Sequence, residues 1–569
     1  MLGAFFIFLS NYFAIFPAQT LRQAFDEVGA FMERGKKDTG NIYSQVFKFA
    51  FIIIGFSVLR GLFMFFMRQT IIVMSRRIEN DQKNEIFNHY QTLPVSFYKN
   101  NSTGDLMSRI SEDVSRVRTF VGPAIMYTLN LIFTFVLVIA AMWSVNPRLT
   151  LFVLIPLPVL SMVMYFVNDV INKKSEEIQG QLSVLTTVVQ EVISGIRVVK
   201  AYARQKSFLA WFQKETDSYF DKNISLAKVD SLYFPSNLLL IGLSTLITIY
   251  VGGLEVIQGR ATAGNIVEFV YFVNMLTWPV SSLGWVTAII QRAAASQKRI
   301  NEFLDTKSDL PEGTHEIINL TEGLSFEKVS FTYADKTQPA INQVSFSVPK
   351  GTTLGIIGAT GSGKSTLANL MVRLMDPQSG KVSIDGKDIR TLSTTSYRKL
   401  FGYVPQDVFL FSDTVLNNIV LGAEQITDNE LKQAEASSQL AEFYDQIQSL
   451  PNGMLTEIGE RGISLSGGQK QRLSIARAFF RSPPILLFDD CLSAIDTQTE
   501  ARILKNIYGF SHGRTAILIS HRVSTVSGAD SILVLDEGKI IEQGTHQQLI
   551  TQGGVYARLF DKQTKEARD

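Results

Sequence analysis

Six long apolar segments precede residue 305, and no other feature of the sequence restricts the fold as strongly. The segments cover approximately residues 2–26, 44–74, 119–145, 148–171, 231–257 and 264–292. Each contains a stretch of about 20 residues, the length that a helix needs to cross a hydrocarbon layer of about 30 Å. The sequence therefore predicts an all-α membrane domain over residues 1–305, with six spanning helices in contact with membrane lipid.

Two long polar segments separate these spans. Residues 75–118 and 172–230 contain few Pro or Gly residues, so we expect helices to continue through them as intracellular helical extensions. The basic residues that follow the second and fourth spans are Arg76, Arg77, Lys83, Lys173 and Lys174. Because basic residues accumulate on the cytoplasmic side of membrane proteins, this pattern places both extensions and the C-terminal part of the chain in the cytoplasm.

The composition changes near residue 305. Over the whole chain 46% of residues are hydrophobic and 19% are charged, but after residue 305 alternating strand and helix patterns replace the long apolar segments. Such alternation is typical of α/β domains. We therefore expect a linker at residues 306–325 and an α/β domain over residues 326–569.

Charge and cysteine content argue against several classes of protein. The net charge is only +2 and the sequence has no long basic run, so nucleic acid is not an expected partner. The single cysteine, Cys491, excludes an intrachain disulfide and a zinc cluster built from cysteines.

A glycine-rich loop lies between a predicted strand and a predicted helix of the α/β domain. Its residues are Gly358, Ala359, Thr360, Gly361, Ser362, Gly363, Lys364 and Ser365, and Thr366 continues the helix. Glycines allow backbone N–H groups to close around phosphates at the positive end of a helix. Lys364 is then expected to reach the β- and γ-phosphates of ATP, and Ser365 to bind Mg²⁺. The eight-residue pattern alone has false positives, but its strand–loop–helix context favours a nucleotide site.

Two further apolar strands end in polar residues of the kind that such a site requires. Asp489 ends the run that starts at Pro484, and it is the expected second ligand of Mg²⁺, directly or through water. Taken alone, this segment could also be an ordinary strand followed by a polar turn. His521 ends another apolar strand, where it can reach the γ-phosphate. A lone histidine in such a place is more often structural.

A second glycine signature follows about a hundred residues after the first loop, at the start of another predicted helix. It consists of Leu465, Ser466, Gly467, Gly468 and Gln469. A serine and two glycines at a helix N-terminus can bind an anion, although they can also be an ordinary helix cap. Because one nucleotide rarely needs two such loops from one chain, we expect two copies of the domain to face each other. ATP would then lie between the loop of one copy and the signature of the other.

Together these motifs resemble the ABC transporter superfamily, in particular exporter half-transporters in which a membrane domain precedes the ATPase domain. The resemblance covers essentially the whole chain. It implies six transmembrane helices followed by an α/β P-loop ATPase domain with a helical subdomain. It also implies ATP-driven export of a hydrophobic or amphipathic substrate, a drug or a lipid, by alternating access across the bacterial inner membrane. A second half-transporter would complete the dimer.

The resemblance also implies roles for individual residues. Tyr333 is similar to the aromatic residue that stacks on adenine, and Gln406 to the Q-loop residue that contacts Mg²⁺ and senses the membrane domain. Ser493 and Asp496 resemble the D-loop that links the two ATP sites, and His521 resembles the switch histidine. The residues that resemble coupling helices or the exporter-specific loop are Asn101, Gly104, Asp105, Gly195, Arg197 and Glu460.

Asp490 departs from the pattern of the family, which usually has glutamate as the base at this position. Aspartate is one methylene shorter, so its carboxylate would lie about 1 Å or more from the productive position, and such a displacement can cost on the order of 10²-fold in rate. We therefore expect ATP to bind well and to be hydrolysed slowly. This combination resembles the degenerate-site subunit of heterodimeric exporters, which we favour over a homodimer that uses Asp490 at both sites.

A different class of function also fits this departure. The chain could be a regulatory ATP-binding membrane subunit or a gated channel with little pumping of its own. Lys364, Gln406 and His521 are all present, which argues against an inactive ATPase. Substrate-stimulated ATP turnover would favour the exporter, and ATP-dependent gating without it would favour the regulatory subunit.

Overall fold

The structure is a computed structural model, which describes residues 1–33, 39–421, 426–459, 462 and 465–566 of the chain. It divides into two compact units. The N-terminal unit comprises Met1–Gln91 and Ser102–Thr306, and the C-terminal unit comprises Thr92–Asn101 and Lys307–Asp569. A short piece of the first polar segment therefore belongs to the second unit.

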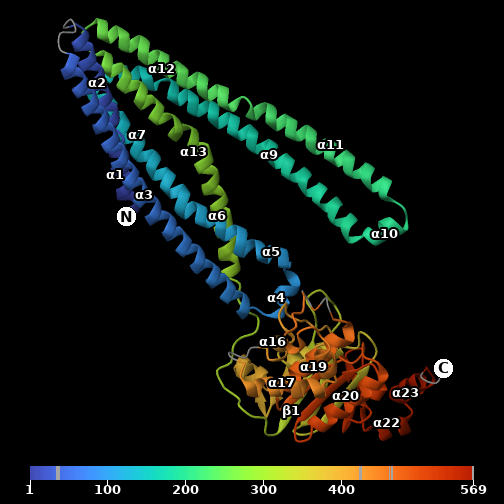
Figure 1. Ribbon diagram of the computed structural model, residues 1–569. Coiled ribbons are helices and arrows are strands. Elements are labelled where there is room, and N and C mark those ends of the chain that lie inside the picture. The colour runs from blue at the N-terminus through green and yellow to red at the C-terminus, as the bar shows by residue number, and fades with distance from the viewer. Residues whose placement is uncertain (34–38, 422–425, 460–461, 463–464, 567–569) are drawn as a thin grey trace. The chain divides into compact units, whose positions relative to one another are not determined.

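The N-terminal unit is built from helices (Figure 1). They are α1 (Leu2–Phe13), α2 (Phe16–Glu33), α3 (Thr39–Thr92), α5 (Thr103–Ser108), α6 (Val114–Thr119), α7 (Ile125–Val145), α8 (Pro147–Leu154), α9 (Pro156–Ser194), α10 (Ile196–Ala201), α11 (Gln205–Asp230), α12 (Tyr233–Ile257) and α13 (Ala263–Leu304). At 1.5 Å per residue, the 54 residues of α3 extend over roughly 80 Å, far more than a bilayer requires. The helix therefore continues well beyond an apolar layer.

Five helical segments of the described residues are long and apolar enough to cross a membrane. They are Leu2–Glu33, Ile42–Thr92, Thr103–Val145, Gln205–Ile257 and Ala263–Leu304. These segments contain five of the six predicted spans. The remaining predicted span, residues 148–171, lies in α8 and the first part of α9, so the count of six stays a prediction.

The first predicted span is not one continuous helix. The apolar pattern over residues 2–26 suggested a single helix, but α1 ends at Phe13 and α2 begins at Phe16. Pro17 explains the break, because proline has no N–H group to donate to the preceding turn and its ring clashes with that turn. Hydrophobic content predicted the span, and the proline decides where it bends.

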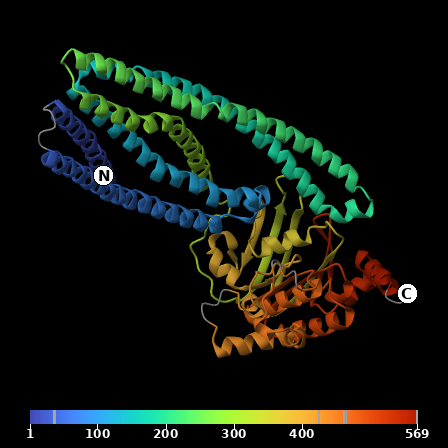
Figure 2. The same cartoon turned by 45° about the horizontal axis from the view of Figure 1, so that its top comes forward.

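The second polar segment is helical over nearly all of its length. Helices α9 and α11 lie side by side, and α10 lies in the connection between them, as two views show (Figures 1 and 2). The chain leaves helical geometry only at Gly195 and at residues 202–204. This pairing extends the N-terminal unit without any sheet.

The C-terminal unit contains two sheets. Its strands are β1 (Gly323–Phe331), β2 (Ile341–Pro349), β3 (Thr353–Gly358), β4 (Ser379–Ile384), β5 (Lys387–Asp388), β6 (Phe401–Val404), β7 (Ile485–Asp489), β8 (Thr515–Ser520), β9 (Ser531–Asp536) and β10 (Lys539–Gly544). The smaller sheet has the order β2-β1-β4-β5 and is antiparallel. The larger sheet has the order β10-β9-β3-β8-β7-β6, and β9 through β6 run parallel.

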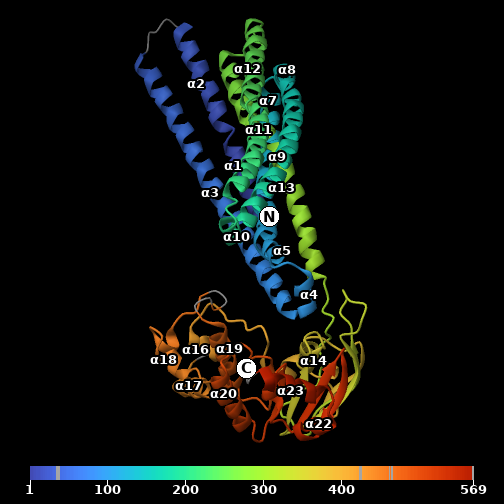
Figure 3. The ribbon, with the colours of Figure 1, turned by 90° about the vertical axis from the view of Figure 1, so that its right-hand side faces the viewer.

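The C-terminal unit also contains helices. They are α14 (Lys364–Met371), α15 (Thr394–Lys399), α16 (Val415–Ile419), α17 (Asp428–Leu440), α18 (Tyr444–Gln448), α19 (Gly467–Phe480), α20 (Thr497–Phe510), α21 (Val523–Val526), α22 (His546–Gln552) and α23 (Val555–Glu566), and the short α4 (Val95–Asn100) also belongs to this unit. Figure 3 shows α16, α17 and α18 at one end of the unit and α22 and α23 at the other.

Alternation of side chains along the buried strands produces two hydrophobic cores. Ile356 and Leu487 belong to the core that includes the smaller sheet, whereas Ile357 and Phe488 belong to the core that includes α19. Successive residues of a strand point to opposite faces, so each of these strands supplies both cores. The larger sheet is thereby covered on both sides, and its polar loops are left at the strand ends.

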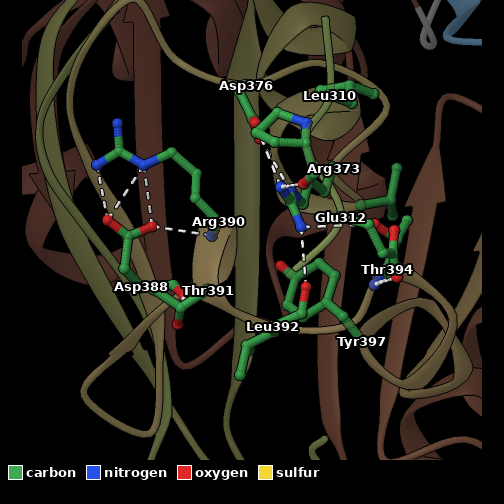
Figure 4. A network of polar contacts seen from close by, with 12 residues as sticks. Leu310, Glu312, Arg373, Asp376, Asp388, Arg390, Thr391, Leu392, Thr394 and Tyr397 are labelled. Atoms are coloured by element: carbon green, nitrogen blue, oxygen red, sulfur yellow. Dashed lines mark hydrogen bonds and ion pairs between the residues drawn. The ribbon is translucent and has the colours of Figure 1, made fainter. Parts of the chain in front are cut away.

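Residues of the predicted linker are tied to the C-terminal unit through Arg373, whose side chain is completely buried (Figure 4). Its guanidinium donates to the carbonyl oxygens of Pro311 at 2.7 Å and Leu392 at 3.0 Å, and to Asp376 Oδ1 at 3.0 Å. Glu312 accepts a hydrogen bond from the Thr394 N–H at 2.7 Å. The chain over residues 311–312 is therefore held firmly rather than free.

We expect Arg373→Leu to destabilise the C-terminal unit by about 3 kcal/mol, because it leaves a carboxylate and two carbonyl groups without their buried donor. Pulse proteolysis of the full chain in increasing urea measures the change. The matched control is Arg390→Leu, since Arg390 is 41% exposed and pairs with Asp388. Such an exposed pair contributes about 1 kcal/mol at most. If both changes lowered the free energy of unfolding by the same small amount, the Arg373 network would not stabilise the unit as expected.

Candidate active site

The loops that follow four neighbouring parallel strands, β3, β8, β7 and β6, meet at one edge of the larger sheet. A cavity of about 590 Å³ lies there. The predicted residues that line it are Tyr333, Thr360, Gly361, Gly363, Lys364, Ser365, Thr366, Gln406, Asp489, Asp490 and His521. Residues from five separate parts of the sequence are thus brought together in one place.

The glycine-rich loop has the geometry of an anion cradle. Gly361 and Gly363 adopt φ angles of +86° and +102°, which side chains rarely tolerate, and a Cβ on Gly363 would lie 2.4 Å from the Ala340 carbonyl oxygen. Helix α14 begins at Lys364, so the N–H groups of its first turn have no partner within the helix. The Ser362 hydroxyl is buried and has no hydrogen-bond partner among the described residues. Polar groups in this loop are therefore available for a phosphate.

Lys364 lies across this loop. Its ammonium group donates to the carbonyl oxygens of Gly358 and Ala359, each at 2.8 Å. Burial lowers the pKa of Lys364, while the nearby charges of Asp490 and Asp489 oppose that shift. The cleft consequently combines one half-buried cation with two carboxylates.

Asp489 and Ser365 fit a divalent cation. Asp489 ends β7 with only 2% of its surface exposed, and burial raises the pKa of its carboxyl group. A hydrogen bond with Ser365 opposes this shift, whereas the charge of Asp490 adds to it. A carboxylate and a hydroxyl are oxygen ligands of the type that Mg²⁺ prefers, and a cation between them would favour the ionised carboxylate.

Asp490 and His521 form a direct pair. The Nδ1 atom of His521 lies 2.9 Å from Asp490 Oδ1 and 3.1 Å from Oδ2. Asp490 has a φ angle of +46°, and its N–H donates to the Ile519 carbonyl at 2.8 Å, which ties the end of β7 to β8. The two side chains are 31 residues apart in the sequence, so only strand pairing reveals their contact.

Tyr333 lines the same cavity as the loop. Its hydroxyl shares a hydrogen bond of 3.1 Å with Thr366 Oγ1, and the Lys99 ammonium lies 5.1 Å from the centre of its ring. The connection between β1 and β2 also contributes residues that the motifs did not indicate, namely Lys336, Thr337, Gln338, Pro339 and Ala340. Their only cue in the sequence is that they follow the aromatic residue.

The second glycine signature does not line this cavity, although all five of its residues are described. Ser466 caps α19: its hydroxyl accepts from the Gln469 N–H at 3.4 Å, and the Gln469 side chain accepts from the Ser466 N–H at 2.7 Å. A Cβ on Gly468 would lie 2.8 Å from the Ala494 carbonyl oxygen. Leu465 is buried in the core, and a Cβ on Gly467 would lie 3.6 Å from the Ala494 Cβ.

The predicted D-loop connects the cavity to this signature. Ser493 Oγ donates to the Asp490 carbonyl at 3.1 Å, and Asp496 caps α20 by accepting from the Thr499 N–H at 2.9 Å. The Ala494 N–H donates to Gln471 Oε1, on the signature helix, at 3.1 Å. The loop after Asp490 therefore bonds both to Asp490, which lines the cavity, and to the signature helix α19.

The predicted coupling residues lie outside the cavity. In the C-terminal unit, Asn101 follows α4 and donates to the Phe97 carbonyl at 2.9 Å. In the N-terminal unit, Gly104 and Asp105 lie in α5, Gly195 ends α9, and Arg197 lies in α10. Glu460 lies outside the described residues. The structure therefore gives positions for five of these six residues and leaves their roles as predictions.

Comparisons with known proteins cover both units. Residues 1–280 match the family described as "ABC transporter transmembrane region", and residues 341–493 match "ABC transporter". The chain is 35% identical to the probable multidrug resistance ABC transporter ATP-binding/permease protein YheI of Bacillus subtilis, over 97% of this chain and 93% of the relative. It is 33% identical to an ATP-dependent lipid A-core flippase of Vibrio cholerae, over 90% and 87%. A bacterial Atm1-family ABC exporter with ATP bound is similar in structure, with a TM-score of 0.80, 26% identity and coverage of 99% and 98%.

Proposed function

The chain belongs to the ABC transporter family, as an exporter-type member that hydrolyses ATP, and we propose that it exports a drug or a lipid as one half of a dimer. The observation that carries this proposal is the cavity that joins the phosphate loop, Asp489, Asp490 and His521. Two relatives, a probable multidrug resistance transporter and a lipid A-core flippase, support a hydrophobic or amphipathic substrate.

Different residues of the cavity bind the phosphates, the adenine and Mg²⁺ and orient the attacking water. The loop N–H groups and Lys364 bind the phosphates, and Tyr333 stacks on adenine. Ser365 and Asp489, together with Gln406, would hold Mg²⁺, which supplies charge neutralisation at the phosphates. Asp490 orients the attacking water, and His521 contacts the γ-phosphate.

Asp490 makes this a slow site. Its carboxylate is 13% exposed and is engaged by His521 at 2.9 Å, which supports a short base held away from the water. The signature, whose serine caps α19, serves the ATP bound by the partner chain. We favour a heterodimer whose other chain supplies glutamate at the matching position; a homodimer with two slow sites is the alternative.

The N-terminal unit contains the transport pathway in this proposal. Six spans cross the bacterial inner membrane, the helical extensions and the ATPase domain lie in the cytoplasm, and residues near Asn101 and Gly195 couple the two. Residues 1–305 form the transmembrane domain, 306–325 the linker and 326–569 the ATPase domain. ATP binding closes the two ATPase domains and opens the transport pathway of the membrane domain to the outside. Hydrolysis then returns the transporter to its starting state. The helices that are long and apolar enough to span a membrane support this arrangement.

Transport by the reconstituted chain tests the proposal. The chain is placed in liposomes alone and together with a candidate partner half-transporter, and ATP-dependent movement of a fluorescent amphipathic dye and of a labelled lipid is followed. Movement of either compound that stops in Lys364→Ala supports export. The second candidate function, a regulatory ATP-binding subunit, rests on Asp490; ATP-dependent gating with no substrate-stimulated turnover would favour it.

We expect Tyr333→Ala to raise the KM for ATP about tenfold while changing kcat little. Stacking of a base on an aromatic ring contributes about 1–3 kcal/mol, and the ring takes no part in hydrolysis. Steady-state ATPase kinetics measure both constants. The control is Tyr333→Phe, which keeps the ring and loses only the hydrogen bond to Thr366. An unchanged KM in Tyr333→Ala would exclude the ring from the nucleotide site.

A further inference from the structure

The short loop between β8 and α21 carries His521 and has polar backbone groups that neither element can satisfy. The His521 carbonyl lies beyond the end of the strand, and the Val523 N–H is the first of the helix. The side-chain amide of Gln563, in the C-terminal helix α23, bonds to both. Its Nε2 donates to the His521 carbonyl at 2.8 Å, and its Oε1 accepts from the Val523 N–H at 2.8 Å. One amide therefore holds the backbone on both sides of Arg522.

The rest of the loop is held from another direction. The Arg522 guanidinium pairs with Glu500, which is 3% exposed, and also donates to the Ser493 carbonyl at 3.4 Å. Thr525 Oγ1 donates to the same glutamate at 3.2 Å. These contacts fix the Arg522 side chain and α21, but none of them contacts the His521 carbonyl.

Space on both sides of the loop leaves room for His521 to move. Besides the nucleotide cavity, His521 lines a second cavity of about 790 Å³, which is bounded by α20, α21 and Gln563. Packing alone therefore does not set the position of the imidazole. The imidazole itself bonds to Asp490, and Gln563 restrains the backbone that carries the imidazole.

We propose that Gln563 is a positioning residue for ATP hydrolysis, which keeps the His521 imidazole against Asp490 and in reach of the nucleotide. This inference rests on the proposed role of His521 in hydrolysis. It makes helix α23 part of the hydrolytic machinery, although α23 does not line the nucleotide cavity. Displacement of a catalytic group by about 1 Å can cost on the order of 10²-fold in rate, so the loss of both hydrogen bonds should be visible in kcat.

The test uses the full chain in lipid nanodiscs and compares Gln563→Leu with the wild type. We expect kcat for ATP to fall by about tenfold or more, with KM within about twofold, because the phosphate loop and Tyr333 are untouched. Gln563→Glu keeps an acceptor for the Val523 N–H and loses the donor to His521, so its kcat should be intermediate. Gln552→Leu is the matched control, since Gln552 is an exposed glutamine that ends α22, and its kcat should not change.

Hydrogen exchange gives a second measurement that does not depend on activity. The amide of Val523 should exchange about tenfold faster in Gln563→Leu, whereas amides of β3 should keep their protection. Unchanged exchange at Val523, or a kcat within twofold of the wild type, would overturn the proposal. A third outcome separates this inference from the proposed function. If Val523 exchanges faster in Gln563→Leu, but neither the wild type nor Asp490→Glu hydrolyses ATP, then Gln563 restrains the backbone and the proposed hydrolytic site is wrong.

Discussion

Replacing Asp490 by glutamate is expected to raise the rate of ATP hydrolysis by up to about 10²-fold. The Asp490 carboxylate lies 2.9 Å from His521 Nδ1, and the Asp490 backbone has a φ angle of +46°. One more methylene would place the carboxylate further into the cavity. A single-turnover measurement is needed, because product release or domain opening can limit the steady-state rate. The affinity for ATP should change little, since Asp490 is not one of the predicted phosphate or Mg²⁺ ligands.

The matched control makes the same chemical change one residue earlier. Asp489→Glu lengthens a carboxylate that is 2% exposed and hydrogen-bonded to Ser365, so it should slow hydrolysis rather than accelerate it. If Asp490→Glu hydrolyses ATP no faster than the wild type, Asp490 is an adequate base. A homodimeric pump would then replace the heterodimer as the favoured arrangement.

Replacing Lys364 by alanine is expected to lower kcat/KM for ATP by about 10²–10³-fold, the range seen when one preorganised donor to a developing charge is removed. Lys364 is the cation that faces Asp489 and Asp490 inside the cavity, and its ammonium already lies on the phosphate loop through Gly358 and Ala359. Alanine would leave two carboxylates close to the phosphates without compensation. Nucleotide binding and ATPase activity measured on the same preparation separate the loss of affinity from the loss of rate.

Lys336→Ala provides the comparison, because Lys336 lines the same cavity from the exposed connection between β1 and β2. The kcat/KM of Lys336→Ala should remain within about threefold of the wild type, since an exposed lysine interacts only weakly with a nearby charge. Similar losses in the two variants would mean that net positive charge, rather than the position of Lys364, determines the activity.

Local sequence was sufficient wherever a function depends on consecutive residues. The strand–loop–helix order around Lys364 requires only neighbouring positions, and the structure shows β3, the loop and α14 in that order. Hydrophobic length likewise predicted helices in the N-terminal unit. The break at residues 14–15 depends on the single Pro17, which the average hydrophobicity of the segment does not reveal.

Distant residues could not be placed in the same way. Asp490 and His521 were each identified by motif, but their contact depends on the parallel pairing of β7 with β8. Gln563 has no motif at all, since a glutamine on a helix carries no local sign that it will bond to the His521 carbonyl 42 residues earlier. Arg373 is similar: its partners Pro311 and Leu392 lie far from it along the chain.

The sequence by itself predicted the two-part organisation, the phosphate loop and an aspartate where the family usually has glutamate, because each depends on residue type within a short window. Only the tertiary structure decided that the Asp490 carboxylate bonds to His521 and that α23 reaches the His521 loop. These features arise from the order in which strands pair and from how helices pack on the sheet. Sheet order and packing are set by the burial of many side chains together, which no single segment encodes.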